Sequence, residues 1–325
     1  MLERALLACA LALLACRSAA AASFDCTKAT SSRDRLICAT PDLSASDSEM
    51  ARIYNADLSK LSNAGKASVA GSQRTWLHQL DTECPPNAVA DGPGAISPAQ
   101  CLARAYGERI QLLKAQVVQF GDIVFFEVDR NLTGLVKGEK LQSTAVYPQR
   151  DRPPSASWRA WNGRQVMSPA SYSACDDGAG TAVTEVDVTF ATSALVSVTR
   201  SDSYYCPPSP HGFGAAKQVT TLLSPSPHQL VAADLFVPGS HWEDFLTGKL
   251  DAAVSAMTTE DSGRKVANRE KATDPGEWVM DRKGLTIAFQ PYEFGMGRNF
   301  NPEAHVSWAD LKPYLRPNLG LPPAQ

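Results

Sequence analysis

The sequence lacks the common motifs of hydrolases, metalloproteases and nucleotide-binding enzymes. It has no G-x-S-x-G, no H-E-x-x-H and no glycine-rich phosphate loop. Its five histidines are scattered along the chain, and no two cysteines have the C-x-x-C spacing of zinc and thiol-redox sites. These absences argue against an enzyme and predict a protein that works without a metal or a cofactor.

Clusters of positive charge and long apolar segments are also missing. Lysine and arginine number 31 against 34 aspartates and glutamates, and no stretch forms the basic stripe of a nucleic-acid-binding protein. Residues 120–325 hold 23 acidic and 19 basic side chains. This mild negative balance favours a cationic partner, although salt screens such an attraction. No run approaches the roughly 20 apolar residues that cross a bilayer. The sequence therefore predicts no nucleic-acid partner and no membrane-spanning helix.

The N-terminus carries a short apolar run, Ala5 to Ala15, that is typical of a secretion signal. Two alternatives remain open for the processing of this signal, which we assign to residues 1–22. The segment Leu13-Leu14-Ala15-Cys16 resembles a bacterial lipobox, in which Cys16 carries a lipid. Alternatively, the small residues Ala20-Ala21-Ala22 suit ordinary cleavage before Ser23. Both alternatives predict an exported protein, periplasmic or anchored to the outer membrane, that meets a membrane only through a lipid.

Six cysteines follow this leader, and an even number in an exported chain indicates three disulfides. They are Cys26, Cys38, Cys84, Cys101, Cys175 and Cys206. Six cysteines allow 15 connectivities, so the sequence alone does not prove the pairing. We predict that neighbours pair: Cys26 with Cys38, Cys84 with Cys101, and Cys175 with Cys206.

Apolar residues recur at helical spacing in three stretches between residues 23 and 117. Ser46–Glu49 fits a capping box for the first stretch, and Gly65 suits the position after its end. The second stretch stops at Cys84-Pro85, because proline cannot continue a helix. Ser97-Pro98 is a good start for the third. This region is predicted to be a small helical domain that its disulfides hold together.

After residue 117 the apolar pattern changes from helical spacing to the alternation that predicts strands. We expect strands at residues 123–128, 144–147, 186–190, 195–199, 219–223, 230–236, 278–280, 285–289 and 305–308. Residues 150–155 have the polar, proline-bearing composition of a loop, and Ser240 is the expected cap of one main helix, residues 242–257. The predicted fold class is α+β, with a disulfide-bonded helical domain (23–117) followed by an antiparallel sheet packed with one main helix (118–325).

The first region resembles a known family of exported bacterial proteins. The order Cys26, Cys38, Gln73-x-x-Trp76, Cys84 and Cys101-Leu102 is similar to that of the N-terminal domain of the lysozyme inhibitor LprI family. The resemblance covers about 90 residues. It implies that this region binds lysozyme. One position departs from the family, which usually carries an arginine where this chain has Leu80, just before Asp81.

The second region resembles the lysozyme-binding C-terminal domain of the anti-sigma factor RsiV. Several segments match in order: Val146-Tyr147-Pro148, Asp234-Leu235-Phe236, and Gly284-Leu285 followed by Phe289 to Gly295. Ser209-Pro210-His211-Gly212 stands where that family has a Gly-Ala-His loop, and Cys175 and Cys206 are additions to the pattern. The resemblance implies that lysozyme is the partner of this half as well.

The two resemblances together favour an envelope protein that binds lysozyme or a related muramidase, and inhibits it, without catalysis. Two loops of the second region are the candidates for the contact. The first carries Tyr204, Tyr205 and His211, and the second carries Tyr292, Glu293, Arg298 and Phe300. These loops are candidates because aromatic residues and arginine are frequent at binding hot spots. Two alternatives remain: a periplasmic structural or assembly protein without a lysozyme contact, and an enzyme acting on the cell wall.

Overall fold

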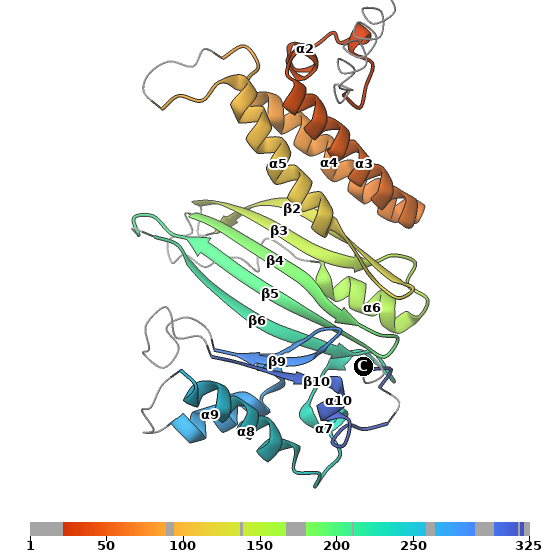
Figure 1. The fold of residues 1–325 in the computed structure, drawn as a ribbon, viewed down its shortest axis with the longest axis vertical. Coiled ribbons are helices and arrows are strands. Elements are labelled where there is room, and N and C mark those ends of the chain that lie inside the picture. Colours follow the sequence, from red (N-terminus) through yellow and green to blue (C-terminus); the bar gives the residue numbers. More distant parts are fainter. Residues whose placement is uncertain are drawn as a thin grey trace, which may run out of the picture. The chain divides into compact units, whose positions relative to one another are not determined.

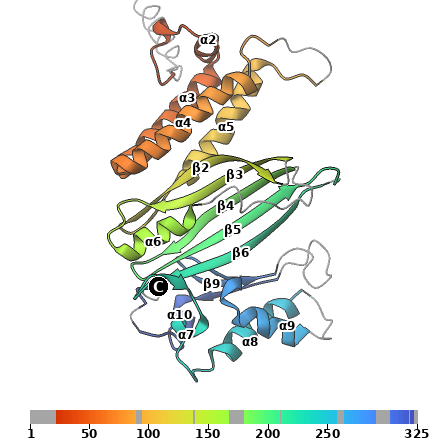
Figure 2. The same cartoon turned by 180° about the vertical axis from the view of Figure 1, so that it is seen from behind.

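A computed structural model of the protein describes residues 22–88, 94–136, 139–166, 180–209, 211–257, 264–289, 302–317 and 319–321. The chain divides into two compact units, an N-terminal unit, Met1–Val117, and a C-terminal unit, Val118–Gln325. Helices form the first unit, whereas strands and helices form the second (Figures 1 and 2).

Helices account for most of the described part of the N-terminal unit. They are the 3-10 helix η1 (Cys26–Lys28) and helices α2 (Ser32–Ala39), α3 (Pro41–Lys60), α4 (Asn63–Glu83) and α5 (Pro98–Gln116). The predicted capping box at Ser46–Glu49 is wrong, because α3 already begins at Pro41. Proline suits this first position, where its missing amide hydrogen costs nothing. The expectation for Gly65 is also wrong, since Gly65 lies in the first turn of α4, where its amide donates to the cap Ser62 at 3.4 Å.

The predicted end of α4 and start of α5 are confirmed. Cys84 directly follows the last residue of α4. Ser97 Oγ accepts from the amide of Gln100 at 3.3 Å, and the side-chain oxygen of Gln100 accepts from the amide of Ser97 at 2.8 Å. This reciprocal pair satisfies two amides that a helix start otherwise leaves unpaired.

Helices α2 to α5 share one apolar core. Its buried members include Ile37, Leu43, Met50, Ile53, Leu80, Leu102, Tyr106, Ile110 and Leu113. The disulfides Cys26–Cys38 and Cys84–Cys101 confirm the predicted pairing here, and they join positions 12 and 17 residues apart. A disulfide that closes a loop of about 15 residues stabilises a fold by roughly 3 kcal/mol, because it constrains the unfolded chain.

The C-terminal unit contains a seven-stranded sheet in which the spatial order of the strands follows the chain. The strands are β1 (Val117–Phe120), β2 (Ile123–Val136), β3 (Glu139–Arg150), β4 (Gly180–Ala191), β5 (Leu195–Tyr205), β6 (Phe213–Leu222) and β7 (His228–Gln229). The hairpin predicted from residues 186–199 is confirmed by antiparallel β4 and β5. In contrast, β3 and β4 are parallel. A parallel pair requires a crossover connection, and helix α6 (Ala156–Gln165) lies within it.

The loop predicted at residues 150–155 is confirmed for residues 151–155, and helix α6, which was not predicted, follows it. Arg150 is the last residue of β3, and Ser155 caps α6 by accepting from the amide of Trp158 at 3.3 Å. Trp158 and Trp161 are 3% and 1% exposed, and both rings contact Phe125 of β2. These two indoles therefore fix α6 to the sheet.

A three-stranded sheet in the order β10–β9–β8 packs against the large sheet, with β8 next to β4 and β5. Its strands are β8 (Trp278–Met280), β9 (Gly284–Ala288) and β10 (Glu303–Ser307). The predicted hairpin turn between β8 and β9 is confirmed. Asp281 Oδ1 accepts from the amides of Lys283 and Gly284 at 2.6 and 2.9 Å, which fixes the turn.

The remaining elements of this unit are helical. They are α7 (Ala232–Leu235), α8 (Trp242–Ser255), α9 (Arg264–Thr273), the 3-10 helix η3 (Pro275–Glu277) and α10 (Trp308–Leu311). Helix α8 packs against α9 and β10 (Figure 1). The strand expected at residues 230–236 is wrong, because Asp234 accepts from the amide of Val231 at 3.0 Å and holds the first turn of α7. The prediction that Ser240 caps α8 is wrong. The residue at the N-cap of α8 is His241, which has a left-handed backbone (φ 61°).

The α+β class is thus confirmed, with more helices around the sheets than the one predicted. The core of the C-terminal unit is rich in large side chains that are at most 2% exposed, among them Phe125, Trp161, Leu195, Phe236, Leu246, Leu250, Trp278, Leu285, Ile287 and Val306. No helix within the described ranges is both long and apolar enough to cross a membrane.

Candidate partner-binding surfaces

The first predicted contact loop is the connection between β5 and β6. Tyr204 pairs with Phe213 in the antiparallel register, so residues 205–212 form the end of this hairpin. Neighbouring side chains on a strand point to opposite faces. Tyr204 accordingly packs against the core of the unit, whereas Tyr205 is 41% exposed. Of the two tyrosines, Tyr205 is therefore the more accessible to a partner.

The same loop is held in shape by short-range contacts. Ser209 Oγ donates to the carbonyl of His211 at 2.9 Å, and the exposed His211 ring lies 3.2 Å from the carbonyl of Gly212. A side chain at Gly212 would place its Cβ only 3.0 Å from the carbonyl oxygen of Tyr204. The loop is therefore compact, and it projects His211 and Tyr205 from one end of the sheet.

Cys206 lies in this loop and takes part in a disulfide. Its predicted partner, Cys175, lies outside the described residues, so this pairing stays a prediction. The proposed lipid site, Cys16, also lies outside them.

The second predicted loop carries Tyr292, Glu293, Arg298 and Phe300, all of which lie outside the described residues. Its flanks are described. The amide of Phe289 donates to the carbonyl of Pro302 at 3.1 Å, just beyond the paired ends of β9 and β10. Both views show these strand ends on the same side of the unit as the end of the β5–β6 hairpin (Figures 1 and 2). The two predicted contact loops thus start from one side of the C-terminal unit.

The N-terminal unit contains a buried polar network that motif reasoning missed. Arg109 of α5 is 5% exposed; its Nε donates to Gln73 Oε1 at 2.9 Å and its Nη2 to Ser72 Oγ at 3.2 Å. The guanidinium carbon also lies 6.0 Å from the centroid of the Trp76 ring. The Gln-x-x-Trp motif therefore holds a buried arginine. The signal in the sequence is that Arg109 falls among the apolar positions of its helix.

A second buried contact links α3 to α5. The Tyr106 hydroxyl donates to Asp47 Oδ1 at 3.2 Å, and the amide of Ser23 donates to Asp47 Oδ2 at 2.7 Å. Burial, together with the nearby Asp47 carboxylate, raises the pKa of Tyr106 far above its ordinary value. The Tyr106 hydroxyl therefore remains a donor at any physiological pH. This pair orders the helices and brings the chain before η1 against α3.

The position that departs from the LprI pattern is part of the core. Leu80 is fully buried among the helices. Its neighbour Asp81 forms an ion pair at 2.8 Å with Arg33 of α2, which also donates to the carbonyl of Leu77 at 3.0 Å. Asp81 of α4 is therefore paired with an arginine of another helix.

The described residues contain no group of three or more His, Cys, Asp or Glu side chains that could hold a metal ion.

Two parts of the chain match known families. Residues 26–113 match the family described as Lysozyme inhibitor LprI, and residues 233–309 match the family described as Protein of unknown function (DUF3298). No curated protein matches the chain. The relation of the second half to RsiV stays a prediction.

Two solved structures, both of DUF3298 family proteins, are similar to this chain. One is from Bacteroides fragilis NCTC 9343; it is 15% identical, and the alignment covers 60% of this chain and 94% of that chain with a TM-score of 0.39. The other is from Pseudomonas aeruginosa PAO1; it is 14% identical, and the alignment covers 61% and 97% of the two chains with a TM-score of 0.39.

Proposed function

We propose that this protein binds lysozyme or a related muramidase in the bacterial envelope and inhibits it without chemical turnover. The observation that carries the proposal is the match of residues 26–113 to the lysozyme inhibitor LprI family. These residues include both described disulfides and the Gln73–Arg109 contact. The family match therefore covers most of the described N-terminal unit.

The structure of this unit suits a binding role. Two disulfides and two buried polar contacts fix the helices before any partner arrives. A surface that is already ordered loses less conformational entropy when it binds. The helical unit can therefore present a firm surface despite its small core.

The C-terminal unit supplies a second candidate surface on the side where the two predicted loops begin. Tyr205 and His211 are exposed there, and residues 120–325 carry a mild negative balance. Lysozyme is strongly basic, and opposite charge increases the rate of encounter more than the final affinity. Under this proposal, the negative unit attracts the enzyme and an aromatic loop contacts it.

The proposal is tested by titrating a c-type lysozyme onto the purified exported protein and, in parallel, by a cell-wall lysis assay. We expect saturable binding and slower lysis. Cytochrome c, a basic protein without muramidase activity, is the control for attraction by charge alone. Equal binding of cytochrome c, or no binding of lysozyme, would contradict the proposal and leave the structural role as the better account.

Loop variants in the same assay locate the contact. We expect Tyr205→Ala with His211→Ala, or Glu293→Ala with Arg298→Ala, to weaken binding by about tenfold or more if the loops hold hot spots. Val231→Ala is the matched control, since it removes an apolar side chain that is 54% exposed elsewhere in the unit. Unchanged binding by both loop variants would assign the contact to the helical unit.

A further inference from the structure

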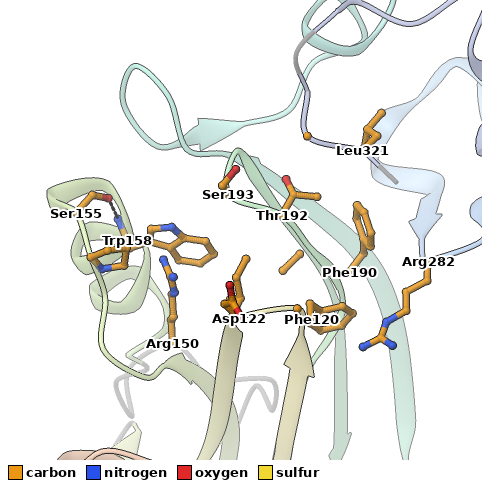
Figure 3. A pocket seen from close by; sticks show the side chains of 15 residues that line it. Phe120, Asp122, Arg150, Ser155, Trp158, Phe190, Thr192, Ser193, Arg282 and Leu321 are labelled. Carbon is orange, nitrogen blue, oxygen red and sulfur yellow. Dashed lines mark hydrogen bonds between the residues drawn. The ribbon is translucent and has the colours of Figure 1, made fainter. Parts of the chain in front are cut away.

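A cavity of about 700 Å³ opens at one end of the seven-stranded sheet. It lies where the β1–β2 turn, the end of β3, the start of α6 and the β4–β5 turn meet (Figure 3). Ligand sites in proteins commonly have volumes of about 300 to 1,000 Å³. The β4–β5 turn and Tyr205 are at opposite ends of β5, roughly 30 Å apart at the rise of an extended strand. The cavity is therefore separate from the predicted loop contacts.

Arg150 gives the cavity its chemical character. Its Nε and Nη1 atoms are buried and have no hydrogen-bond partner among the described residues. The guanidinium lies 4.2 Å from the centroid of the Trp158 ring, and Figure 3 shows it directed toward this ring at the wall of the cavity. Burial lowers the pKa of Arg150, but arginine remains charged in proteins. Arg150 is therefore a partly buried cation at the cavity wall, and two of its nitrogens lie against protein atoms without a hydrogen-bond partner among the described residues.

Two hydrogen bonds fix the backbone of Arg150, so the base of its side chain is held in place. The amide of Arg150 donates to Asn162 Oδ1 at 2.9 Å, and Asn162 Nδ2 donates to the carbonyl of Arg150 at 3.0 Å. These two bonds join the end of β3 to α6. Trp158, on the same helix, is 3% exposed. The cation and the ring beneath it are therefore ordered before a ligand arrives.

The other charges at the cavity are exposed to water. Among the described lining residues, Arg150 is the one charged side chain that is not exposed; Asp122 and Arg282 both are. Arg282 lies 5.2 Å from the centroid of Phe120 and donates to the carbonyl of Gln119. Solvent screens exposed charges far more than partly buried ones. The electrostatic preference of the cavity is therefore set by Arg150 and is for an anion.

The remaining lining is largely apolar. Phe120 and Phe190 contact each other edge to face with centroids 6.3 Å apart, and Leu321 lies across from them (Figure 3). Both residues are already buried, at 9% and 2% exposed, so they form a fixed apolar wall. A polar ligand body would lose its hydrogen bonds to water against such a wall, whereas an apolar body has none to lose.

We propose that this cavity binds a small carboxylate with an aromatic or similarly apolar body. The carboxylate lies against Arg150, and the body lies against Phe120, Phe190 and Leu321. A single partly buried cation balances one negative charge, so a carboxylate fits better than a phosphate dianion, whose second charge would face apolar walls. The proposal is independent of lysozyme binding.

The test is calorimetric titration of the full exported protein with three probes: indole-3-acetate, its neutral analogue indole-3-acetamide, and inorganic phosphate. We expect the carboxylate to bind about tenfold or more tightly than the amide, because a hydrogen bond to a charged group is the stronger kind. Equal affinity for the amide, tighter binding of phosphate, or no binding of the carboxylate would each overturn the proposal.

Variants assign the site to Arg150. Arg150→Met keeps the length of the side chain and removes the charge, so carboxylate binding should fall by about tenfold or more while lysozyme binding is unchanged. Arg159→Met removes the same charge from an exposed position of α6 and should bind the carboxylate normally. Arg150→Lys keeps the cation and should retain measurable binding, which gives a readout even if Arg150→Met fails to fold. Unchanged carboxylate affinity in Arg150→Met would contradict the assignment.

Discussion

At the scale of single residues, buried polar groups organise the helical unit. Arg109 and Gln73 are both less than 10% exposed, and each satisfies part of the other's hydrogen-bonding capacity. Gln73 Nε2 also lies 3.5 Å from Met50 Sδ, so the amide links α4 to both α3 and α5. A buried polar pair of this kind contributes modestly when complete, but it is costly to break.

Gln73→Leu tests that contact. Leucine has a similar size but removes the acceptor for Arg109 Nε, so we expect the free energy of unfolding to fall by roughly 2 kcal/mol. Urea unfolding followed by circular dichroism measures this change. Gln79→Leu is the matched control on the exposed side of the same helix, where a change within about 0.5 kcal/mol is expected. Equal stability of the two variants would mean that the buried contact adds nothing.

At the scale of elements, close backbone approach decides how the small sheet is built. Gly284 begins β9 and pairs with Ser307 of β10. A Cβ atom at Gly284 would lie 2.0 Å from the carbonyl oxygen of Val306. The absence of a side chain therefore allows β9 and β10 to pair at this end, next to the Asp281 turn.

Gly284→Ala should separate these strands and destabilise the C-terminal unit by about 1–3 kcal/mol, the usual range for overpacking. The control is Gly248→Ala in α8, whose added Cβ meets nothing within 4 Å. That change should stabilise the helix by up to about 1 kcal/mol, because alanine has the higher helix propensity. Thermal unfolding of both variants measures the two shifts. A Gly284→Ala protein as stable as the unmutated one would refute the close approach.

Elements with a strong periodic pattern were predictable from the sequence, and those fixed by a few contacts were not. The α5 start at Ser97, the β4–β5 hairpin and the β8–β9 turn at Asp281 all follow from local signals. Helix α6 is only ten residues long, and it depends on Trp158 and Trp161 packing onto a distant strand. Tertiary packing of this kind leaves little trace in local periodicity.

The same limit applies to the candidate sites. Tyr205 and His211 could be selected as loop residues, but the difference in exposure between Tyr204 and Tyr205 depends on the strand register. Arg150 gave no sequence signal, since its burial results from α6 folding over the end of β3. A cavity lined by five segments spread between residues 120 and 321 can be found only once the fold is known.

At the scale of the whole molecule, the disulfides and the predicted N-terminal leader bear on where the protein works. Disulfides persist in oxidising compartments such as the bacterial periplasm. Cys26–Cys38 and Cys84–Cys101 therefore support export, as does the apolar run at residues 5–15. Export would also bring the protein to the compartment where an external lysozyme attacks the wall.

Cys16→Ala distinguishes the two ways of processing the leader. If Cys16 carries a lipid, the variant should move from the membrane fraction to the soluble periplasmic fraction, because buried acyl chains hold the anchor in the bilayer. Cys9→Ala is the control, since Cys9 lies in the same apolar run without a lipobox. Fractionation and immunoblotting measure the distribution. A distribution that Cys16→Ala leaves unchanged would favour ordinary cleavage before Ser23.

The parallel pairing of β3 with β4 has a consequence for how the large sheet forms. The antiparallel neighbours close short loops: Ala191 pairs with Val196, and Tyr204 with Phe213. Leu141, in contrast, pairs with Gly180, which is 39 positions further along the chain. The entropy lost on closing a loop rises with its length, and non-local pairing slows folding. The hairpins can therefore form early and independently, and we expect the pairing of β3 with β4 to form after them.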